Sequence, residues 1–305
     1  MSAELKIAPP VPMDFPLSPP AWAYQLVSDS LLHTQSSSAT GTSIQSRLGS
    51  RFSLISAHIP SARSMSPAQL GESIYSVYMQ IADLLSAAPA SRPVRFWNHI
   101  CHIHEAQGPA MDRYMAFNGG RFRAFSQWYG DQSNFDRCVA TGTGVGCLGE
   151  DIFIHALAAD HDGIAIANPR QVQPFRYSSR FGPRPPCFAR ATLLPTSSKQ
   201  YMLMIGGTAS IRGEESMFVG DLPRQLNETF ENLRVLVTHA GEQVGRSANL
   251  TNITDLRIYL SQPSTAAQIE SASRAAMPTA TQVQLLSADL CRQELMVEIE
   301  GRATF

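Results

Sequence analysis

The apolar residues of this chain follow two spacings. Across residues 67–88 they recur every three to four positions, which places them on one face of an amphipathic helix. Ser66 and Pro67 are a typical cap and first residue for it, and Pro89 and Pro93 indicate where it ends. The same spacing predicts further helices over residues 111–128, 216–240 and 264–275.

Shorter apolar runs, several of them alternating with polar residues, predict strands. They cover residues 51–58, 94–103, 152–158, 256–260, 281–286 and 294–300, with one more strand around Val139. The order helix, strand, helix, strand, strand therefore occurs twice, with an offset of about 160 residues, and indicates an internal duplication. We expect an α/β (α+β) fold of two modules, each a mixed sheet with two helices packed on one face.

The expected boundaries follow from this order. Residues 51–160 would form the N-terminal module and residues 161–305 the C-terminal module. Residues 1–50 are rich in proline and serine, so we expect an irregular arm over the body with one short strand at most.

Composition narrows the class of protein. The chain has 305 residues, 44% of them hydrophobic, which excludes disorder for most of its length. Its net charge of -1 argues against a dedicated nucleic-acid-binding protein. No apolar run reaches the roughly 18 residues of a membrane span, and the N-terminus has no apolar signal core. Five scattered cysteines without a CxxC pair fit a reduced, cytoplasmic protein.

Two motifs suggest chemistry that their context does not support. Gly142-Thr-Gly-Val-Gly-Cys-Leu-Gly is similar to a nucleotide-binding loop, but a strand rather than a helix follows it, so we favour a tight glycine turn. His99-Ile-Cys-His-Ile-His-Glu is similar to a metal cluster. On a strand, however, only His102 and His104 share a face, and two ligands do not make a zinc site. We expect no metal here.

The segment from Asn168 to Arg190 carries five arginines among prolines and aromatic residues, with no acid between them. Its prolines exclude a helix. Unpaired arginines in a rigid loop predict an anion site, and the planar guanidinium suits carboxylates. An RNA-binding loop would be similar, although the neutral net charge disfavours it, and solvated surface arginines are the remaining alternative.

The predicted last strand is Glu294-Leu-Met-Val-Glu-Ile-Glu. Alternation turns Leu295, Val297 and Ile299 into the core, so the glutamates share the opposite face. A carboxyl group such as that of Glu298 would have a raised pKa if this face lined a cleft, and it could then donate a proton. If the face met solvent, these would be ordinary surface glutamates.

The second half of the chain resembles the YjgF/RidA family. The residues that carry this resemblance are Met204-Ile-Gly-Gly-Thr-Ala-Ser, Gly220-Asp, Gln225, Phe230-Glu-Asn-Leu and Val297-Glu-Ile-Glu. From about residue 50 to 305 the chain resembles, more specifically, the chorismatases. The matching motifs are Arg95-Phe-Trp-Asn, Arg113-Tyr-Met-Ala-Phe-Asn-Gly-Gly-Arg121, Asn168-Pro-Arg-Gln, Arg176-Tyr, Gly182-Pro-Arg-Pro, Phe188-Ala-Arg190, Gly207-Thr-Ala-Ser-Ile and Leu295-Met-Val-Glu-Ile-Glu-Gly.

The resemblance implies two YjgF/RidA-like modules with the active site in the C-terminal one. It implies chorismate as substrate, with no metal and no organic cofactor. Tyr177 and Arg190 match positions that hold the substrate, and Arg121 is a further candidate carboxylate clamp. Glu298 matches the general acid that protonates the enolpyruvyl group, and the partners implied are this small molecule alone, without nucleic acid or membrane.

The product branch depends on Cys291. The branch that forms 3-hydroxybenzoate carries a cysteine seven residues before the acid, as here, whereas the hydrolytic branch carries alanine. Glu214 and Glu215 fall where the family has a small residue that shapes the ring pocket, so Glu215 joins the candidate substrate-binding residues. A carboxylate there would repel a dianionic substrate unless Arg212 pairs with it.

Several alternatives stay open at this point. One is hydrolysis of chorismate to a dihydroxycyclohexadienoate, and another is a mixed 3- and 4-hydroxybenzoate output. A YjgF-like metabolite-binding protein without turnover is a third. The sequence also leaves open whether the protein is a monomer or a homotrimer.

Overall fold

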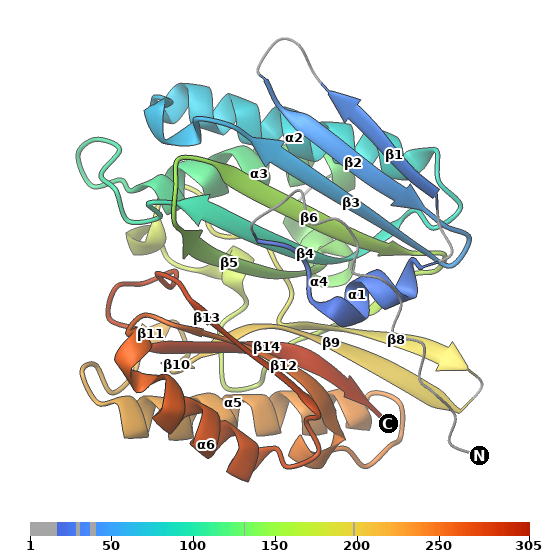
Figure 1. Cartoon of the computed structure of the whole chain (residues 1–305), viewed down its shortest axis with the longest axis vertical. Coiled ribbons are helices and arrows are strands. Elements are labelled where there is room, and N and C mark those ends of the chain that lie inside the picture. The colour runs from blue at the N-terminus through green and yellow to red at the C-terminus, as the bar shows by residue number, and fades with distance from the viewer. Residues whose placement is uncertain (1–16, 29–30, 37–40, 131, 198) are drawn as a thin grey trace, which may run out of the picture.

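The computed structural model describes residues 17–28, 31–36, 41–130, 132–197 and 199–305. Two six-stranded sheets pack face to face, and each carries its long helices on the outer face (Figure 1). The layers are therefore helices, sheet, sheet, helices. In the described part of the chain, no helix is both long and apolar enough to cross a membrane.

The first sheet has the strand order β1-β2-β3-β6-β4-β5. Its strands are β1 (Leu31–Ser36), β2 (Ser43–Leu48), β3 (Phe52–Ile59), β4 (Arg92–Cys101), β5 (Thr141–Cys147) and β6 (Ile152–Ala159). The helices of this half are α1 (Ala21–Leu26), α2 (Pro67–Ser86), α3 (Arg113–Tyr129) and α4 (Phe135–Cys138). Helices α2 and α3 cover the outer face of the sheet (Figure 1).

The second sheet has the order β13-β12-β14-β9-β8-β7. Its strands are β7 (Ile164–Ile166), β8 (Ala191–Ser197), β9 (Gln200–Ala209), β12 (Ile253–Leu260), β13 (Gln282–Ser287) and β14 (Val297–Thr304). Helices α5 (Leu222–Glu242) and α6 (Ala266–Ala276) cover its outer face, and β10 (Ile211–Arg212) and β11 (Glu215–Ser216) form a separate two-stranded ribbon.

The two halves share one topology. Among the described strands, each sheet has a single parallel pair. Helices α3 and α4 connect β4 to β5, and α6 connects β12 to β13. When the two strand orders are superposed, β1-β2-β3-β6-β4-β5 corresponds to β7-β8-β9-β14-β12-β13. The expected fold class, two modules with a mixed sheet and two helices on one face, is confirmed. Residues 160 and 161 lie between β6 and β7, and the division into modules of residues 51–160 and 161–305 stays a prediction.

Capping side chains mark the starts of the three long helices α2, α3 and α5. Ser66 accepts from the backbone N–H of Gln69 while the Gln69 side chain accepts from Ser66, which forms a capping box at the start of α2. Asp112 caps α3 through the N–H of Met115. Helix α5 begins at Leu222 rather than near residue 216, because Asp221 caps it through the N–H of Arg224.

Three expectations need correction. The described residues before 51 are not an irregular arm: α1 packs on the body, and β1 and β2 join the first sheet, where alternation buries Ile44. The glycine motif from Gly142 is not a tight turn, since it lies in β5. Strands β7, β8 and β9 were not predicted, because β7 has only three residues, Pro195 interrupts the apolar run of β8 and the Gly206–Gly207 pair interrupts that of β9. Residues 1–16 of the arm lie outside the described residues.

Candidate active site

A cavity of about 340 Å³ lies between the two sheets. Gly142 and Gly144 of β5 line it from the first sheet, and Gly207 of β9 and Glu298 of β14 line it from the second. This volume is within the usual range for a small-molecule site. The cavity is thus built where the strands of the two halves face each other.

Glycines leave room here for larger side chains. A Cβ atom on Gly207 would lie 1.9 Å from Oε1 of Glu298, so only glycine lets that carboxyl group occupy its place. A Cβ atom on Gly144 would lie 3.2 Å from the ring of Tyr114, and one on Gly142 would lie 2.7 Å from Cβ of Phe188. The glycine-rich motif of β5 therefore shapes the cavity instead of holding a nucleotide phosphate.

Glu298 is buried in this cavity, with 4% of its surface exposed. Burial raises the pKa of its carboxyl group to about 8, and the negative charge of Glu300 adds to this shift. Arg95 and Arg190 oppose the shift, but only in part. The carboxyl group is therefore mostly protonated at neutral pH and can act as a proton donor.

Glu300 lies on the same face of β14 but has a different environment. Its carboxylate accepts from Nη2 of Arg95 at 2.8 Å, from Nε1 of Trp97 at 3.0 Å and from Oγ1 of Thr143 at 2.6 Å. These three partners come from the first sheet, so Glu300 ties the two halves together. Neither glutamate is a surface residue, and that alternative is wrong.

Cys291 lies beside Glu298, with its Sγ atom 3.9 Å from Oε2. Burial raises the pKa of the thiol to about 12, and the neighbouring carboxyl group of Glu298 contributes to this shift. The side chain is therefore a thiol at neutral pH, not a thiolate.

Two arginines extend into the cavity, Arg190 and Arg292. Arg190 donates to the hydroxyl group of Tyr177 at 2.6 Å and to the carbonyl oxygen of Val172 at 3.0 Å. Arg292 donates to the carbonyl oxygen of Glu214 at 2.8 Å and to Oγ of Ser216 at 3.0 Å. Nε of Arg190 and Nη2 of Arg292 are buried and have no partner among the described residues. Two guanidinium groups that line one cavity are suited to carboxylate ligands.

The arginine-rich segment as a whole is not an anion site. Acids from elsewhere in the chain neutralise three of its arginines: Arg170 pairs with Glu228, Arg176 with Asp136 and Arg180 with Glu215. Arg184 lies over the ring of Phe122 instead. Of the five arginines expected to bind an anion, Arg190 alone lines the cavity in the described structure.

Two candidate residues do not line the cavity. Arg121 is buried in α3, where it donates to Asn118 at 2.7 Å and lies behind Tyr114, whose ring does line the cavity. Glu215 is 59% exposed, since it points away from the cavity to Arg180. The structure thus places neither residue at the cavity, and their roles as direct substrate contacts stay predictions.

The charge balance around Glu214 and Glu215 also differs from the expectation. Arg212 pairs with Glu228 at 2.8 Å rather than with either of these glutamates. Arg180 supplies the compensating charge, and Glu214 additionally accepts from the backbone N–H of Ser178 at 2.9 Å. Neither carboxylate therefore faces a ligand in the cavity.

Sequence reasoning missed Arg292 and Tyr114. Arg292 directly follows Cys291, so its place in the loop before β14 was the available signal. Tyr114 lies within the Arg113–Arg121 motif that pointed to Arg121.

Among the described residues, no group of three or more His, Cys, Asp or Glu could hold a metal ion. His99 is buried, and burial lowers the pKa of its imidazole well below the ordinary value.

Comparison with known proteins agrees with this geometry. The family model described as "Chorismatase FkbO/Hyg5-like, N-terminal" matches residues 31–158. A 3-hydroxybenzoate synthase of Streptomyces hygroscopicus is 32% identical over 237 residues, which cover 75% of this chain and 68% of that protein. The chain belongs to the chorismatase family. A chorismatase of Streptomyces rapamycinicus is 29% identical over 233 residues, 74% of this chain and 68% of that protein.

A solved structure of a chorismatase has the same fold. A crystal structure of a chorismatase aligns with a TM-score of 0.77 at 24% identity and covers 90% of this chain and 80% of that one. A member of the YjgF/YER057c/UK114 family from Mycobacterium tuberculosis is also similar, with 18% identity and a TM-score of 0.31, over 39% of this chain and 86% of that one. This member of the chorismatase family therefore shares its two-sheet architecture with a solved relative.

Proposed function

We propose that this protein converts chorismate into 3-hydroxybenzoate and pyruvate. The observation that carries the proposal is one cavity lined by the buried Glu298, whose pKa is raised, and by the two arginines Arg190 and Arg292. Chorismate offers two carboxylates for the arginines and an enol ether for the acid. The proposed steps of the reaction use no metal and no organic cofactor.

The proposed binding mode follows from the arginines. Arg190 and Arg292 each bind one carboxylate, since each has a buried N–H group without a partner. The hydroxyl group of Tyr177, already held by Arg190, completes one of the two carboxylate sites. The faces of Phe181 and Phe188 line the same cavity and contact the ring.

The proposed reaction begins with the proton on Glu298. It is transferred to the methylene carbon of the enolpyruvyl group, and an oxocarbenium-like centre forms next to the ether oxygen. The ring hydroxyl group then displaces this activated group at the neighbouring carbon, so that pyruvate leaves and an epoxide-like ring remains. The hydroxyl proton released in this displacement returns to the carboxylate of Glu298. Opening of the epoxide-like ring then gives the aromatic product, because the ring carbon loses a proton and the epoxide oxygen gains one. No water is consumed, which distinguishes this route from hydrolysis.

Cys291 is the proposed determinant of this product. Its side chain fills space beside Glu298 that a water molecule would need for hydrolysis. As a thiol, it can also relay a released proton to the carboxylate of Glu298, by accepting that proton as it gives up its own. The 32% identical relative named 3-hydroxybenzoate synthase supports this branch.

Cys291→Ala is expected to shift the ring product towards the dihydroxycyclohexadienoate, with pyruvate still released. Alanine leaves room for about one water molecule and cannot relay a proton. Cys291→Ser should give an intermediate mixture. Chromatography of the ring products measures the ratio, and Cys101→Ala is the matched control because Cys101 is buried in the core of the first sheet. An unchanged 3-hydroxybenzoate fraction in Cys291→Ala would show that the cysteine has a packing role only.

The pH dependence of kcat/KM should follow the proton on Glu298. A general acid must be protonated before it can react, and the pKa of this group is raised to about 8. We therefore expect a level profile below pH 8 and a fall of about tenfold per pH unit well above it. A profile that rises through this range would assign Glu298 to base catalysis.

Incubation of the purified protein with chorismate tests the proposed function directly. Pyruvate is quantified enzymatically, and the ring product is identified by chromatography and mass spectrometry. Equal amounts of pyruvate and 3-hydroxybenzoate are expected. The diene diol would indicate the hydrolytic branch, 4-hydroxybenzoate a mixed output, and binding of chorismate without pyruvate a metabolite-binding protein.

A further inference from the structure

We infer that Glu228, which lies on α5 outside the cavity, is a positioning residue that sets the spacing of Arg190 and Arg292 and thereby the preference for a ligand with two carboxylates. The inference rests on the proposed function, because it assigns the two arginines to two carboxylates of one ligand.

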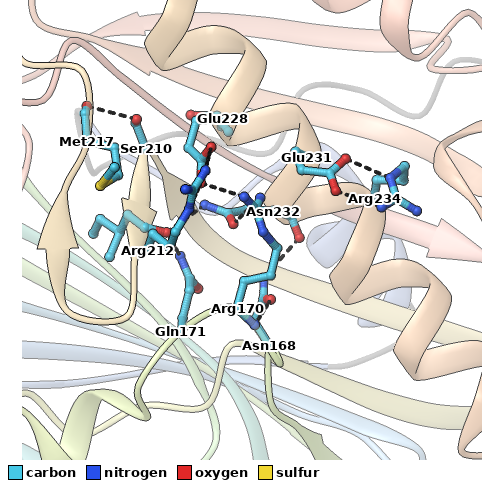
Figure 2. Close-up of polar contacts among 12 residues, drawn as sticks. Asn168, Arg170, Gln171, Ser210, Arg212, Met217, Glu228, Glu231, Asn232 and Arg234 are labelled. Carbon is cyan, nitrogen blue, oxygen red and sulfur yellow. Dashed lines mark hydrogen bonds and ion pairs between the residues drawn. The ribbon is translucent and has the colours of Figure 1, made fainter.

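Figure 2 shows the Glu228 carboxylate between two arginines. Oε1 accepts from Nη2 of Arg170 at 2.7 Å and from Nε of Arg212 at 3.2 Å, while Oε2 accepts from Nη2 of Arg212 at 2.8 Å. Only 5% of the Glu228 side chain is exposed. Arg170 belongs to the loop between β7 and β8, and Arg212 belongs to β10, so one carboxylate links α5 to both segments.

The two segments are also bonded to each other. Gly213 accepts from the backbone N–H of Val172 at 2.9 Å and donates to the carbonyl oxygen of Arg170 at 2.8 Å. Asn232, one turn after Glu228 on α5, accepts from Nη1 of Arg170 at 2.8 Å and donates to the carbonyl oxygen of Ile211 at 2.8 Å (Figure 2). The loop and the ribbon therefore share one anchor on the helix.

These same segments orient the cavity arginines. The carbonyl oxygen of Val172, two residues after Arg170, accepts from Arg190 at 3.0 Å. The carbonyl oxygen of Glu214, two residues after Arg212, accepts from Arg292 at 2.8 Å. A shift of the loop against the ribbon would therefore move one guanidinium group relative to the other.

This spacing matters only to a ligand that uses both arginines. A monocarboxylate needs one guanidinium group and is indifferent to the position of the second. A dicarboxylate must meet two planar forks at once, and each fork binds well only in the correct geometry. Glu228 is thus expected to act on the choice between these ligand classes without touching either.

Glu228→Gln tests the inference, with Glu231→Gln as the matched control. Glu231 lies three residues further on the same helix, and its ion pair with Arg234 is exposed (Figure 2). For Glu228→Gln we expect the KM for chorismate to rise on the order of tenfold, with kcat changed by about twofold or less. This effect is smaller than the roughly hundredfold loss of rate that a misplacement of about 1 Å can cause. Glu231→Gln should leave both parameters unchanged.

Calorimetry with two inert probes separates this inference from the proposed function. Wild-type protein should bind benzene-1,3-dicarboxylate more tightly than benzoate, and Glu228→Gln should lose most of that difference while binding benzoate as before. This outcome would support the role of Glu228 even if chorismate were not turned over. Equal weakening of both probes, or equal behaviour of Glu228→Gln and Glu231→Gln, would overturn it.

Arg212→Gln covers the case in which Glu228→Gln does not fold. Removal of one partner from a buried ion pair is often strongly destabilising, whereas Arg212 is 52% exposed and its loss leaves Glu228 paired with Arg170. We expect the same loss of dicarboxylate preference in this variant, at a smaller size. If a folded Arg212→Gln protein kept the wild-type preference for the dicarboxylate, the ribbon would have no part in setting the distance between Arg190 and Arg292.

Discussion

Glu298→Gln is expected to lower kcat for chorismate by roughly 10²- to 10⁴-fold, the usual contribution of general acid catalysis. Glutamine keeps the size and the hydrogen-bonding capacity of the side chain but has no proton to transfer. KM should change little, because in the proposed binding mode the two arginines that line the cavity, and not Glu298, bind the carboxylates. Steady-state kinetics with pyruvate detection measure both parameters.

Glu294→Gln is the matched control for this experiment. Glu294 also lines the cavity, but its carboxylate accepts from Oγ of Ser216 at 2.6 Å and is not placed to act as the acid. A loss of less than about tenfold is expected there. If the two variants lost activity equally, or if Glu298→Gln kept near-normal turnover, the proton would have to come from another group.

The sequence was sufficient to predict the face on which Glu298 lies. Alternation along residues 294–300 separates Val297 and Ile299 from Glu298 and Glu300, and the structure keeps that separation in β14, although this strand begins at Val297 and not at Glu294. It could not show that the second face is buried as well. That follows from packing against the first sheet, where the partner of Glu300 is Arg95, which is 205 residues away in the chain.

The same limit explains the errors in the arginine-rich loop. Within residues 168–190 there is no acid, so local sequence predicts unpaired arginines. In the fold, Asp136 and Glu228 approach Arg176 and Arg170 from segments 40 and 58 residues away. Pairing at such separations is decided by topology, and no periodicity in the sequence reports it.

The resemblance of the motif located the helix that carries Arg121, but it did not identify which residue of that helix lines the cavity. The motif from Arg113 to Arg121 lies on α3, and one residue of it, Tyr114, does reach the cavity. Helical geometry places Arg121 about two turns further along, where its guanidinium group is buried behind the tyrosine ring. A matched motif therefore identified the correct helix, and the packing of that helix selected a different residue.

Arg190→Ala is expected to weaken chorismate binding by about 2–4 kcal/mol, the cost of removing one partner of a buried charge pair. This corresponds to a rise in KM of roughly 30- to 700-fold. Arg190→Lys should restore only part of the loss, because an ammonium group cannot form the planar two-point contact. Arg184→Ala is the control from the same loop, since Arg184 lies over Phe122 outside the cavity lining.

A double variant decides whether the two arginines hold one ligand. If Arg190 and Arg292 bind separate carboxylates of the same molecule, either single alanine variant already abolishes simultaneous contact, so the losses in the double variant should not add. Fluorescence or calorimetric titration with chorismate in the Glu298→Gln background gives these affinities without turnover. Fully additive losses would indicate that the two arginines bind independently. An unchanged affinity in Arg190→Ala would show that the carboxylate binds elsewhere, and Tyr177 would then have a packing role only.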